Sequence, residues 1–476
     1  MSRGPFPSLI IRADELEPVG AFAEAQAEFL TPDAGTVADL GALLRAHNAG
    51  IVAHFYMDPE LQGVLSSLDW PHVKISDSLL MADAAVRMVE AGARSIVVLG
   101  VDFMSENVRA MLDASGFTDV PVYRVAADPI GCSLAESAEA PVYGAYLTQA
   151  SHTPNSLHVI YINTSLVTKA RSHHLVPTIT CTSSNVVQTV LQAAAQVPDI
   201  NIWFGPDTYM GQNLRELFGG LAGMDDAAIK AVHPAHDRAS IAGLLERFHH
   251  FQQGVCIVHH MFGAGVVEVV ERDYADVYVT AHLEVPGEMF GLAMAAQRKG
   301  RGVVGSTSDI LGFIAGKVNA GEGGRLRFVL GTEAGMITAI VRKVQGILRE
   351  QGAGLEAEII FPVASEAVAR TDDAELGIVP GVAGGEGCTT AGGCATCPYM
   401  KMNSLDALMD LLRRVGVQDD KLVPFFPRTY IEKVGGRTAA EVGGEPILHM
   451  RHFQRTGELS HELVADIQGR QRRTGS

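Results

Sequence analysis

The sequence predicts an α/β protein in which one α/β unit occurs three times. Apolar runs alternate with helix-forming stretches along the chain, which is typical of a parallel sheet covered by helices. The same order of segments also recurs, and one cysteine follows each occurrence. We therefore expect three homologous three-layer α/β/α domains, arranged about a pseudo-threefold axis with a central active site.

Aligning the chain with itself reveals the repeat. Apolar runs at 50–58, 158–165 and 277–288 each carry polar groups near their ends and open one unit. Equivalent turns lead into helices at Asp77-Ser78, Ser183-Ser184 and Ser306-Thr307, and equivalent strands close with GVD at 100–102, GPD at 205–207 and GTE at 331–333. The spacing grows from 105 residues (Asp102 to Asp207) to 126 (Asp207 to Glu333), as loop insertions would cause.

The repeat sets the predicted domain boundaries. Residues 1–36 form an N-terminal extension with a short helix near 22–29. The three units then occupy 37–155, 156–260 and 261–400, and a helical segment at 401–476 ends the chain.

Composition restricts the class of protein. The chain has 476 residues, of which 47% are hydrophobic and 19% charged, as expected for a globular enzyme. Its net charge of −17 offers no basic field for nucleic acid. We find no apolar signal sequence near the N-terminus and no apolar run long enough for a membrane span. We therefore expect a cytoplasmic protein with reduced thiols and with neither nucleic acid nor membrane as a partner.

Half of the six cysteines, Cys388, Cys394 and Cys397, lie in a glycine-rich loop at 387–403. Cys132 and Cys256 end the first two units, and one of the loop cysteines would end the third. Strand ends of open α/β sheets carry the working residues, so three thiolates should meet at one cavity. Three ligands leave one iron of a [4Fe–4S] cluster open, and such an iron can act as a Lewis acid.

Other readings of the cysteines stay open. A structural zinc would need a fourth ligand, which His259 or His260 could provide beside Cys256. Cys394 and Cys397 could instead form a redox disulfide. The repeat favours the cluster over zinc. Cys181 is interpreted as a packed core thiol.

A set of motifs in a fixed order carries a resemblance to a known family. The motifs are HFY (54–56), DSL (77–79), GVDFMSE (100–106), GCSLAE (131–136), YINT (161–164), CTSSN (181–185), HLE (282–284), GST (305–307), GTEAGM (331–336) and CPYMKMNSL (397–405). Together they resemble quinolinate synthase, the iron–sulfur quinolinate synthetase A family, over roughly residues 40–453.

The resemblance implies an activity and a site. Members of this family condense iminoaspartate with dihydroxyacetone phosphate to give quinolinate, phosphate and water for NAD synthesis. The implied cluster ligands are Cys132, Cys256 and Cys397, with Cys394 as the alternative third ligand. Tyr56 is the implied acid–base tyrosine, and the implied substrate contacts are His54, Ser78, Tyr161, Asn163, Ser183, His282, Glu284 and Thr307. An aspartate-oxidising enzyme would supply iminoaspartate.

The residue types suit this chemistry. Substrates with two carboxylates and a phosphate fit helix N-termini that carry hydroxyl groups. His282 and Glu284 lie two residues apart and would share one face of a strand, so both are catalytic candidates, with Glu284 as the general base. Two rival functions remain, another iron–sulfur hydro-lyase acting on a dicarboxylate and a non-catalytic iron–sulfur redox sensor.

Overall fold

The computed structural model describes residues 6–28, 31–351, 354–362 and 396–474, so Cys388 and Cys394 lie outside the described residues. The chain divides into two compact units. The first unit comprises Met1–Val101, Phe117–Ile130 and Ile257–Pro427. The second unit comprises Asp102–Gly116, Gly131–Cys256 and Arg428–Ser476.

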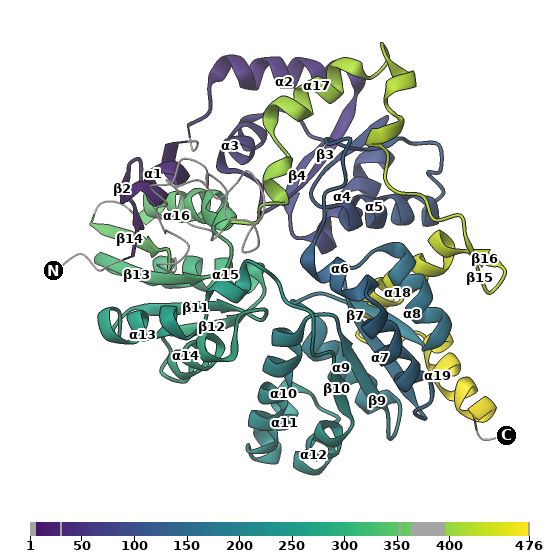
Figure 1. Cartoon of the computed structure of the whole chain (residues 1–476). Coiled ribbons are helices and arrows are strands. Elements are labelled where there is room, and N and C mark those ends of the chain that lie inside the picture. Colours follow the sequence, from purple (N-terminus) through teal and green to yellow (C-terminus); the bar gives the residue numbers. More distant parts are fainter. Residues whose placement is uncertain (1–5, 29–30, 352–353, 363–395, 475–476) are drawn as a thin grey trace, which may run out of the picture. The chain divides into compact units, whose positions relative to one another are not determined.

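The first unit contains two sheets. One has the order β4-β3-β5-β6 and is parallel throughout. Its strands are β3 (Ala49–His54), β4 (Val73–Ser76), β5 (Ser95–Leu99) and β6 (Val122–Arg124). Every residue of β3 is buried, which explains why this segment reads as a continuous apolar run and not as an alternating one. The first unit's helices around this sheet are α2 (Ala34–His47), α3 (Pro59–Ser67) and α4 (Ser78–Glu90) (Figure 1).

The other sheet of the first unit has the order β12-β11-β13-β14-β1-β2. Its parallel strands are β11 (Tyr278–His282), β12 (Gly302–Gly305), β13 (Gly324–Gly331) and β14 (Leu355–Ile360). The helices that follow in this part of the chain are α13 (Ala264–Asp273), α14 (Gly287–Arg298), α15 (Thr307–Asn319) and α16 (Ile337–Gln351).

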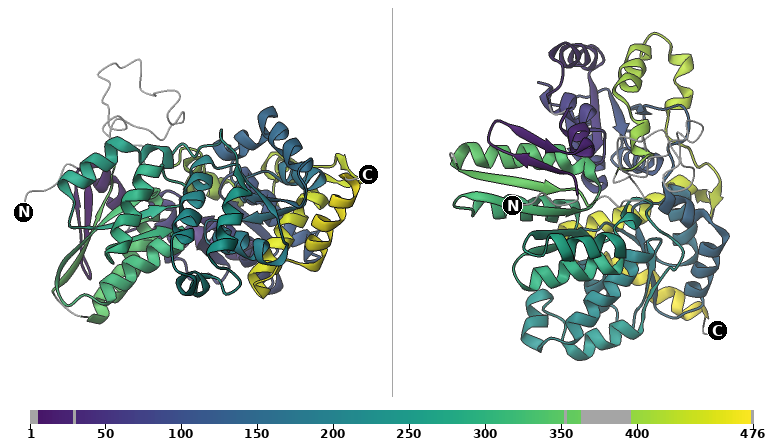
Figure 2. Two further views of the ribbon diagram at one scale, coloured as in Figure 1. Left: turned by 90° about the horizontal axis from the view of Figure 1, so that it is seen from below. Right: turned by 60° about the vertical axis from the view of Figure 1, so that its left-hand side comes forward.

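An antiparallel hairpin extends this sheet at β14. β1 (Ser8–Ile11) pairs with β14, so that Ser8 lies opposite Ile360, and β2 (Leu16–Val19) pairs with β1. Leu9 and Ile11 are fully buried in the core beneath the sheet. The right-hand view of Figure 2 shows the purple hairpin beside the green strands. The sequence predicts only an extension here, so the hairpin is an addition to the predicted fold.

The second unit is built on one parallel sheet of order β10-β9-β7-β8. Its strands are β7 (Ser156–Tyr161), β8 (Thr178–Cys181), β9 (Asn201–Gly205) and β10 (Phe248–His250). Its longer helices are α5 (Asp102–Ala114), α7 (Pro141–Ser151), α8 (Leu166–Leu175), α9 (Val186–Gln196), α10 (Thr208–Ala222), α18 (Ala439–Thr456) and α19 (His461–Thr474). Helices α18 and α8 pack closely against each other.

Shorter elements connect these. They are α1 (Ala21–Glu28), α6 (Ser133–Glu139), α11 (Asp226–Val232), α12 (Arg238–Glu246), α17 (Leu405–Arg414), η1 (His259–Met261), η2 (Ala334–Met336), η4 (Met400–Met402), η5 (Asp419–Lys421), η6 (Val423–Phe425), β15 (Lys433–Val434) and β16 (Arg437–Thr438).

The α/β class predicted from the sequence is confirmed. In each of the three sheets that contain parallel strands, these strands follow the same order, second, first, third and fourth along the chain. The strands that occupy equivalent positions can therefore be compared directly between sheets. The arrangement of three domains about a pseudo-threefold axis stays a prediction.

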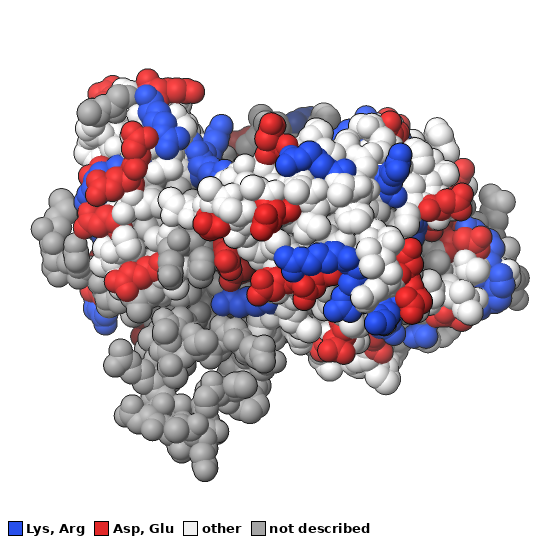
Figure 3. Space-filling model, turned by 90° about the horizontal axis from the view of Figure 1, so that it is seen from above, with Lys and Arg blue, Asp and Glu red and all other residues white. Residues whose placement is uncertain are grey.

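The charged side chains do not form a field of one sign on the face seen in Figure 3, where Lys and Arg are interspersed with Asp and Glu. Among the described residues, no helix has the length and apolarity needed to cross a bilayer.

Candidate active site

The first parallel strand of each sheet ends in a polar residue, and a second candidate site residue follows two positions later. β3, β7 and β11 end at His54, Tyr161 and His282, and two residues further along the chain lie Tyr56, Asn163 and Glu284. In the first unit, both histidines use the same contact. His54 Nδ1 accepts the backbone N–H of Tyr56 at 3.2 Å, and His282 Nδ1 accepts that of Glu284 at 3.3 Å. An acceptor nitrogen carries no proton, so in each ring Nε2 bears the hydrogen.

Both histidines are buried and neutral. Burial lowers the pKa of His54 to about 3, with Glu284 opposing this shift and His282 adding to it. Burial likewise lowers the pKa of His282 to about 4, opposed by Glu284. Two neutral imidazoles thus present Nε2–H donors at the ends of two strands of one unit. The two histidines interact electrostatically with each other.

A hydrogen-bonded relay joins Tyr56 to Glu284. His259 lies between Glu284 and Thr332, with Nδ1 at 3.1 Å from Glu284 Oε2 and Nε2 at 3.3 Å from Thr332 Oγ1. Thr332 Oγ1 is also 3.3 Å from the Tyr56 hydroxyl. Since an ionised carboxylate only accepts, His259 Nδ1–H is the donor to an ionised Glu284, and His259 Nε2 shares a hydrogen bond with the Thr332 hydroxyl. The relay can therefore pass a proton between an acid and a base.

Two helix N-termini lie beside each other in the same unit. Asp77 caps α4 by accepting from Leu80 N–H at 3.0 Å, and it also accepts a hydrogen bond from Ser308 near the start of α15. Ser306 caps α15 through a capping box with Asp309. Ser78 and Thr307 are the first residues of these helices, so their neighbours do the capping. Both hydroxyls lie where a helix N-terminus favours an anion.

In the second unit, the predicted residues follow the neighbouring strands β7 and β8. Tyr161 ends β7 opposite Cys181, the last residue of β8, and Ser183 follows two residues later. The helix after β8 begins later than the sequence analysis placed it, because Asn185 and not Ser183-Ser184 is the N-cap residue of α9. Parallel strands end at one edge, so Tyr161, Asn163 and Ser183 belong to the same edge of the sheet.

A buried lysine holds the loop that carries Asn163. Lys169 has no exposed surface, and its Nζ donates to Ile162 O at 3.1 Å and, by a shorter contact, to Thr164 O. These two carbonyls flank Asn163, so the ammonium fixes the backbone on both sides of it. Glu106 interacts electrostatically with Lys169 and accepts from Leu166 N–H at 2.9 Å and from Tyr430 at 2.8 Å.

The cysteines differ in ways that matter for metal binding. Cys132, Cys256 and Cys397 are thiols outside disulfides and are only partly buried. Ser133 Oγ donates to Val255 O at 3.0 Å, which brings the segments carrying Cys132 and Cys256 together in the second unit. Cys181 is fully buried, and burial raises the pKa of its thiol well above the usual value. A thiol that resists ionisation suits the core, whereas three soft, accessible donors suit an iron–sulfur cluster.

Glu333, at the carboxyl end of β13, contacts one of these cysteines. It is buried, and its carboxylate accepts the backbone N–H of Cys397 at 3.1 Å. Burial raises the pKa of Glu333 to about 8, against the opposing effect of its hydrogen bonds to Cys397 and Gly335.

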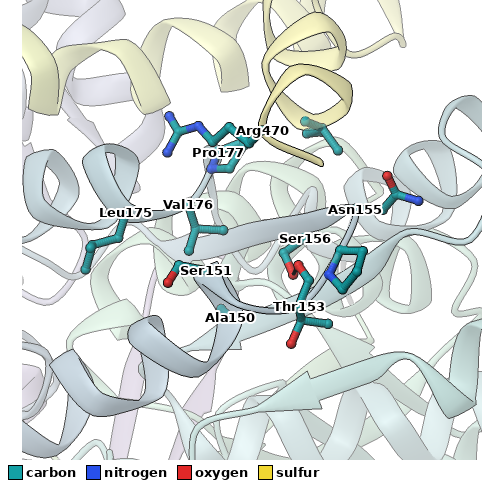
Figure 4. A pocket seen from close by; sticks show the side chains of 11 residues that line it. Ala150, Ser151, Thr153, Asn155, Ser156, Leu175, Val176, Pro177 and Arg470 are labelled. Atoms are coloured by element: carbon teal, nitrogen blue, oxygen red, sulfur yellow. Dashed lines mark hydrogen bonds between the residues drawn. The ribbon is translucent and has the colours of Figure 1, made fainter. Parts of the chain in front are cut away.

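Two hollows in the second unit contain none of the predicted residues. One, of about 20 Å³, is lined by Ser151, Asn155, Val176 and Arg470 among others, and has room for about one water (Figure 4). The other, of about 440 Å³, is lined by residues including His173, Glu445 and His449. The candidate site is thus recognised by its clustered titratable groups.

Sequence reasoning overlooked three residues of this site as functional groups. His259 was considered only as a zinc ligand, and Thr332 and Glu333 only as the end of a strand. Thr332 and Glu333 lie in the GTE tripeptide that the self-alignment had marked, so their position was visible although their contacts were not. The roles of the other predicted residues stay predictions.

The fold and the site together define an α/β protein with a buried acid–base relay and partly exposed thiols, features of an enzyme. Comparison with known proteins specifies the family. The family described as "Quinolinate synthetase A protein" matches residues 38–355. The chain belongs to this family.

The relatives agree. A "Quinolinate synthase, chloroplastic" of Nicotiana tabacum is 55% identical over 480 residues, covering 97% of this chain and 67% of the relative. That of Oryza sativa subsp. japonica is 52% identical, covering 97% and 69%. A "Quinolinate synthase" of Prochlorococcus marinus is 26% identical over 398 residues, covering 82% of this chain and 88% of the relative. The chain spans about two thirds of the length of the plant relatives.

The names of the plant relatives correct one expectation. Relatives at 52–55% identity are named chloroplastic, so the cytoplasmic location predicted from the sequence is wrong. That prediction relied on the lack of an apolar leader. A plastid transit peptide is amphipathic and not apolar, so this observation could not distinguish the two compartments.

Proposed function

We propose that this protein is a quinolinate synthase, a transferase that condenses iminoaspartate with dihydroxyacetone phosphate. The products are quinolinate, phosphate and two waters, so atoms balance without an oxidant or a reductant. The proposal rests on family membership and on one structural observation, the hydrogen-bonded relay from Tyr56 through Thr332 and His259 to Glu284. The reaction needs repeated proton removal and hydroxyl loss, which a linked acid and base can perform.

Each catalytic or substrate-contacting residue predicted in the first unit has a proposed role. Glu284 removes the proton next to the imine or carbonyl, and Tyr56 returns a proton to the departing hydroxyl. His54 and His282 donate Nε2–H to carboxylate oxygens, a role that suits their neutral state at pH 7. Ser78 and Thr307 hold anionic groups at the starts of α4 and α15.

In the second unit we propose Tyr161, Asn163 and Ser183 as further substrate contacts. The Lys169 clamp supports this for Asn163, because a fixed backbone orients a side chain that must meet a small substrate. Tyr161 is buried at the end of β7, where its hydroxyl can serve as donor or acceptor.

We propose Cys132, Cys256 and Cys397 as the ligands of a [4Fe–4S] cluster. With one iron lacking a protein ligand, such a cluster supplies a Lewis acid for a substrate oxygen. An aspartate-oxidising enzyme is the proposed source of iminoaspartate, and the names of the plant relatives support a plastid as the compartment.

An anaerobic assay tests the function. Protein with its iron and sulfide counted receives iminoaspartate and dihydroxyacetone phosphate, and quinolinate and phosphate are followed together. We expect equal amounts of both products. Fully loaded protein that makes neither would overturn the proposal, and such a result would favour the redox-sensor alternative.

Substitution of the cysteines tests the cluster separately. Cys132→Ser, Cys256→Ser and Cys397→Ser should each abolish iron binding, whereas Cys181→Ser should retain it because that thiol is a core group. A Cys397→Ser protein that still holds a full complement of iron would assign the third ligand to another cysteine.

A further inference from the structure

Glu333 uses both oxygens of its carboxylate to hold the backbone. Oε1 accepts the N–H of Cys397 at 3.1 Å, and Oε2 accepts the N–H of Gly335 at 3.0 Å. The side chain is 1% exposed, so solvent does not compete for these bonds. A carboxyl group has an acceptor on each oxygen, so this one side chain can hold two backbone N–H groups at once.

Gly335 passes this restraint to a second loop. Its carbonyl accepts from Gln62 Nε2 at 2.7 Å, and the same Nε2 lies within hydrogen-bonding distance of Phe55 O and Met57 O. These carbonyls flank Tyr56. A Cβ on Gly335 would lie 2.8 Å from Tyr56 Cα, so the two backbones touch. One carboxylate therefore connects Cys397 with the loop that carries Tyr56.

The equivalent acids that follow the other two sheets are aspartates. Asp207 caps its own helix by accepting from Met210 N–H at 2.7 Å, and Asp102 is the first residue of α5. Glutamate is one methylene longer than aspartate, so Glu333 caps η2 with one oxygen and reaches Cys397 with the other.

Cys397 lies 37 residues after Ile360, where β14 ends, and its contact with Glu333 connects it to the carboxyl end of β13. We propose that Glu333 is a positioning residue that fixes the backbone of Cys397 and couples it to the Tyr56 loop. The functional meaning of this restraint relies on the proposed role of Cys397 as a ligand, but the restraint itself can be measured without metal.

The first test uses metal-free protein. Glu333→Gln keeps the size of the side chain but offers one acceptor oxygen and an NH₂ group where two N–H groups need acceptors. We expect the alkylation rate of Cys397, followed by mass spectrometry of its peptide, to rise roughly tenfold or more. Glu358→Gln is the matched control, since Glu358 is a buried carboxylate of the same sheet that binds Ser8 and Arg327 instead. It should leave the rate within about twofold.

The second test uses iron-loaded protein. Iron loss to a chelator, followed by visible absorbance, should be roughly tenfold faster in Glu333→Gln than in the wild-type protein or in Glu358→Gln. Thermal unfolding of both variants measures how much stability each has lost. If Glu333 had a purely structural role, the two variants would lose stability to a similar extent. Equal alkylation and equal iron loss in the two variants would overturn the proposal.

A wild-type measurement covers the case in which Glu333→Gln does not fold. The amide hydrogen of Cys397 should exchange with solvent deuterium at least about a hundredfold more slowly than an unstructured amide. Exchange at the unstructured rate would overturn the proposal. Slow exchange and raised alkylation in a protein that makes no quinolinate would keep the Glu333 restraint while rejecting the function.

Discussion

Glu284 combines two contacts that suit a general base. Its backbone N–H fixes the ring of His282, and its carboxylate receives the Nδ1–H of His259. The carboxylate is therefore held in place while remaining able to accept a proton. A base that is positioned and buried in this way needs no rearrangement when the substrate arrives.

Replacing Glu284 by Gln should separate proton transfer from binding. Gln keeps the volume and one acceptor but cannot take up the proton, so we expect turnover to fall by roughly a hundredfold or more. The iron content should not change. Steady-state rates with both substrates, measured without oxygen, give the result. Wild-type turnover in this variant would assign the base elsewhere and leave the family assignment intact.

Thr332 allows a test of the relay itself, because its hydroxyl can affect turnover without contacting the substrate. Thr332→Val keeps the shape but removes the hydroxyl between Tyr56 and His259. If the relay returns protons to Tyr56, turnover should fall by about tenfold, while the Michaelis constants change by less than about threefold. Thr338→Val is a suitable control, since Thr338 is a buried threonine on α16 outside the relay. Equal turnover in the Thr332 and Thr338 variants would show that the hydroxyl is dispensable.

At this scale the sequence predicted more positions than contacts. The predicted site residues include His54, Tyr56, His282 and Glu284, and in the structure these lie at or just after the ends of the equivalent strands β3 and β11. The contact of Glu333 with Cys397 could not be predicted, because Cys397 lies 64 residues further along the chain. A pattern in a linear sequence carries no record of such distant pairings.

At the scale of elements, the packing of α18 on α8 depends on one glycine. A Cβ on Gly443 would lie 2.2 Å from Leu166 O, whereas one on Gly444 would meet only Ala110 Cβ at 4.0 Å. The two neighbouring glycines therefore differ in packing while sharing one helix. Only the first is required for the close approach of the two helices.

This pair gives an internally controlled stability test. Alanine in a helix interior is favoured over glycine by about 0.8–1 kcal/mol. Gly444→Ala should therefore stabilise the protein by up to about 1 kcal/mol. Gly443→Ala should destabilise it by about 1–3 kcal/mol, since the methyl group meets backbone that cannot rotate away. Urea unfolding followed by circular dichroism measures both, and a stabilised Gly443→Ala would contradict the close packing.

The hairpin β1–β2 shows why elements can escape sequence analysis. Each strand has four residues, too few for a clear alternation, and its partner β14 lies about 350 residues away. The parallel strands, in contrast, are buried apolar runs followed by helix caps, signals that can be recognised locally.

For the whole molecule, the recurring strand order explains why self-alignment found the fold class. Equivalent strand ends carry the predicted site positions, so the chain acts as its own set of homologous sequences. Self-alignment could not assign a role to each side chain, because the side chains differ between the copies. The predicted roles came from the family resemblance, and the comparisons then confirmed the family.

Buried neutral histidines should make the protein sensitive to acid. Burial lowers the pKa values of His54 and His158 to about 3, and those of His282 and His449 to about 4. The unfolded chain binds protons on these residues below about pH 6.5, whereas the native state does not, so stability should fall as the pH drops through that window. At pH 5 each fully buried histidine should cost about 1–2 kcal/mol relative to pH 7.

Glu333 opposes this loss of stability in acid, and a variant of His158 isolates the contribution of one histidine. Glu333, with its pKa raised to about 8, binds a proton more readily in the native state and so favours folding as the pH falls from 8 towards 4.5. His158→Gln preserves a partner for the Tyr143 hydroxyl, which lies 2.9 Å from His158 Nε2, but removes one titrating group. Urea midpoints of metal-free protein at pH 5 and pH 7 should differ less in this variant than in the wild type. An unchanged difference would mean that His158 is already protonated in the native state.

The pairs at the ends of β3, β7 and β11 have a consequence for symmetry. They are His–x–Tyr, Tyr–x–Asn and His–x–Glu, so three different pairs of side chains occupy equivalent places in the backbone. In a homotrimer of a single unit, every substitution would appear three times at once. Joining the units in one polypeptide removes that constraint, because each copy can change alone. Each pair can then acquire a chemistry of its own.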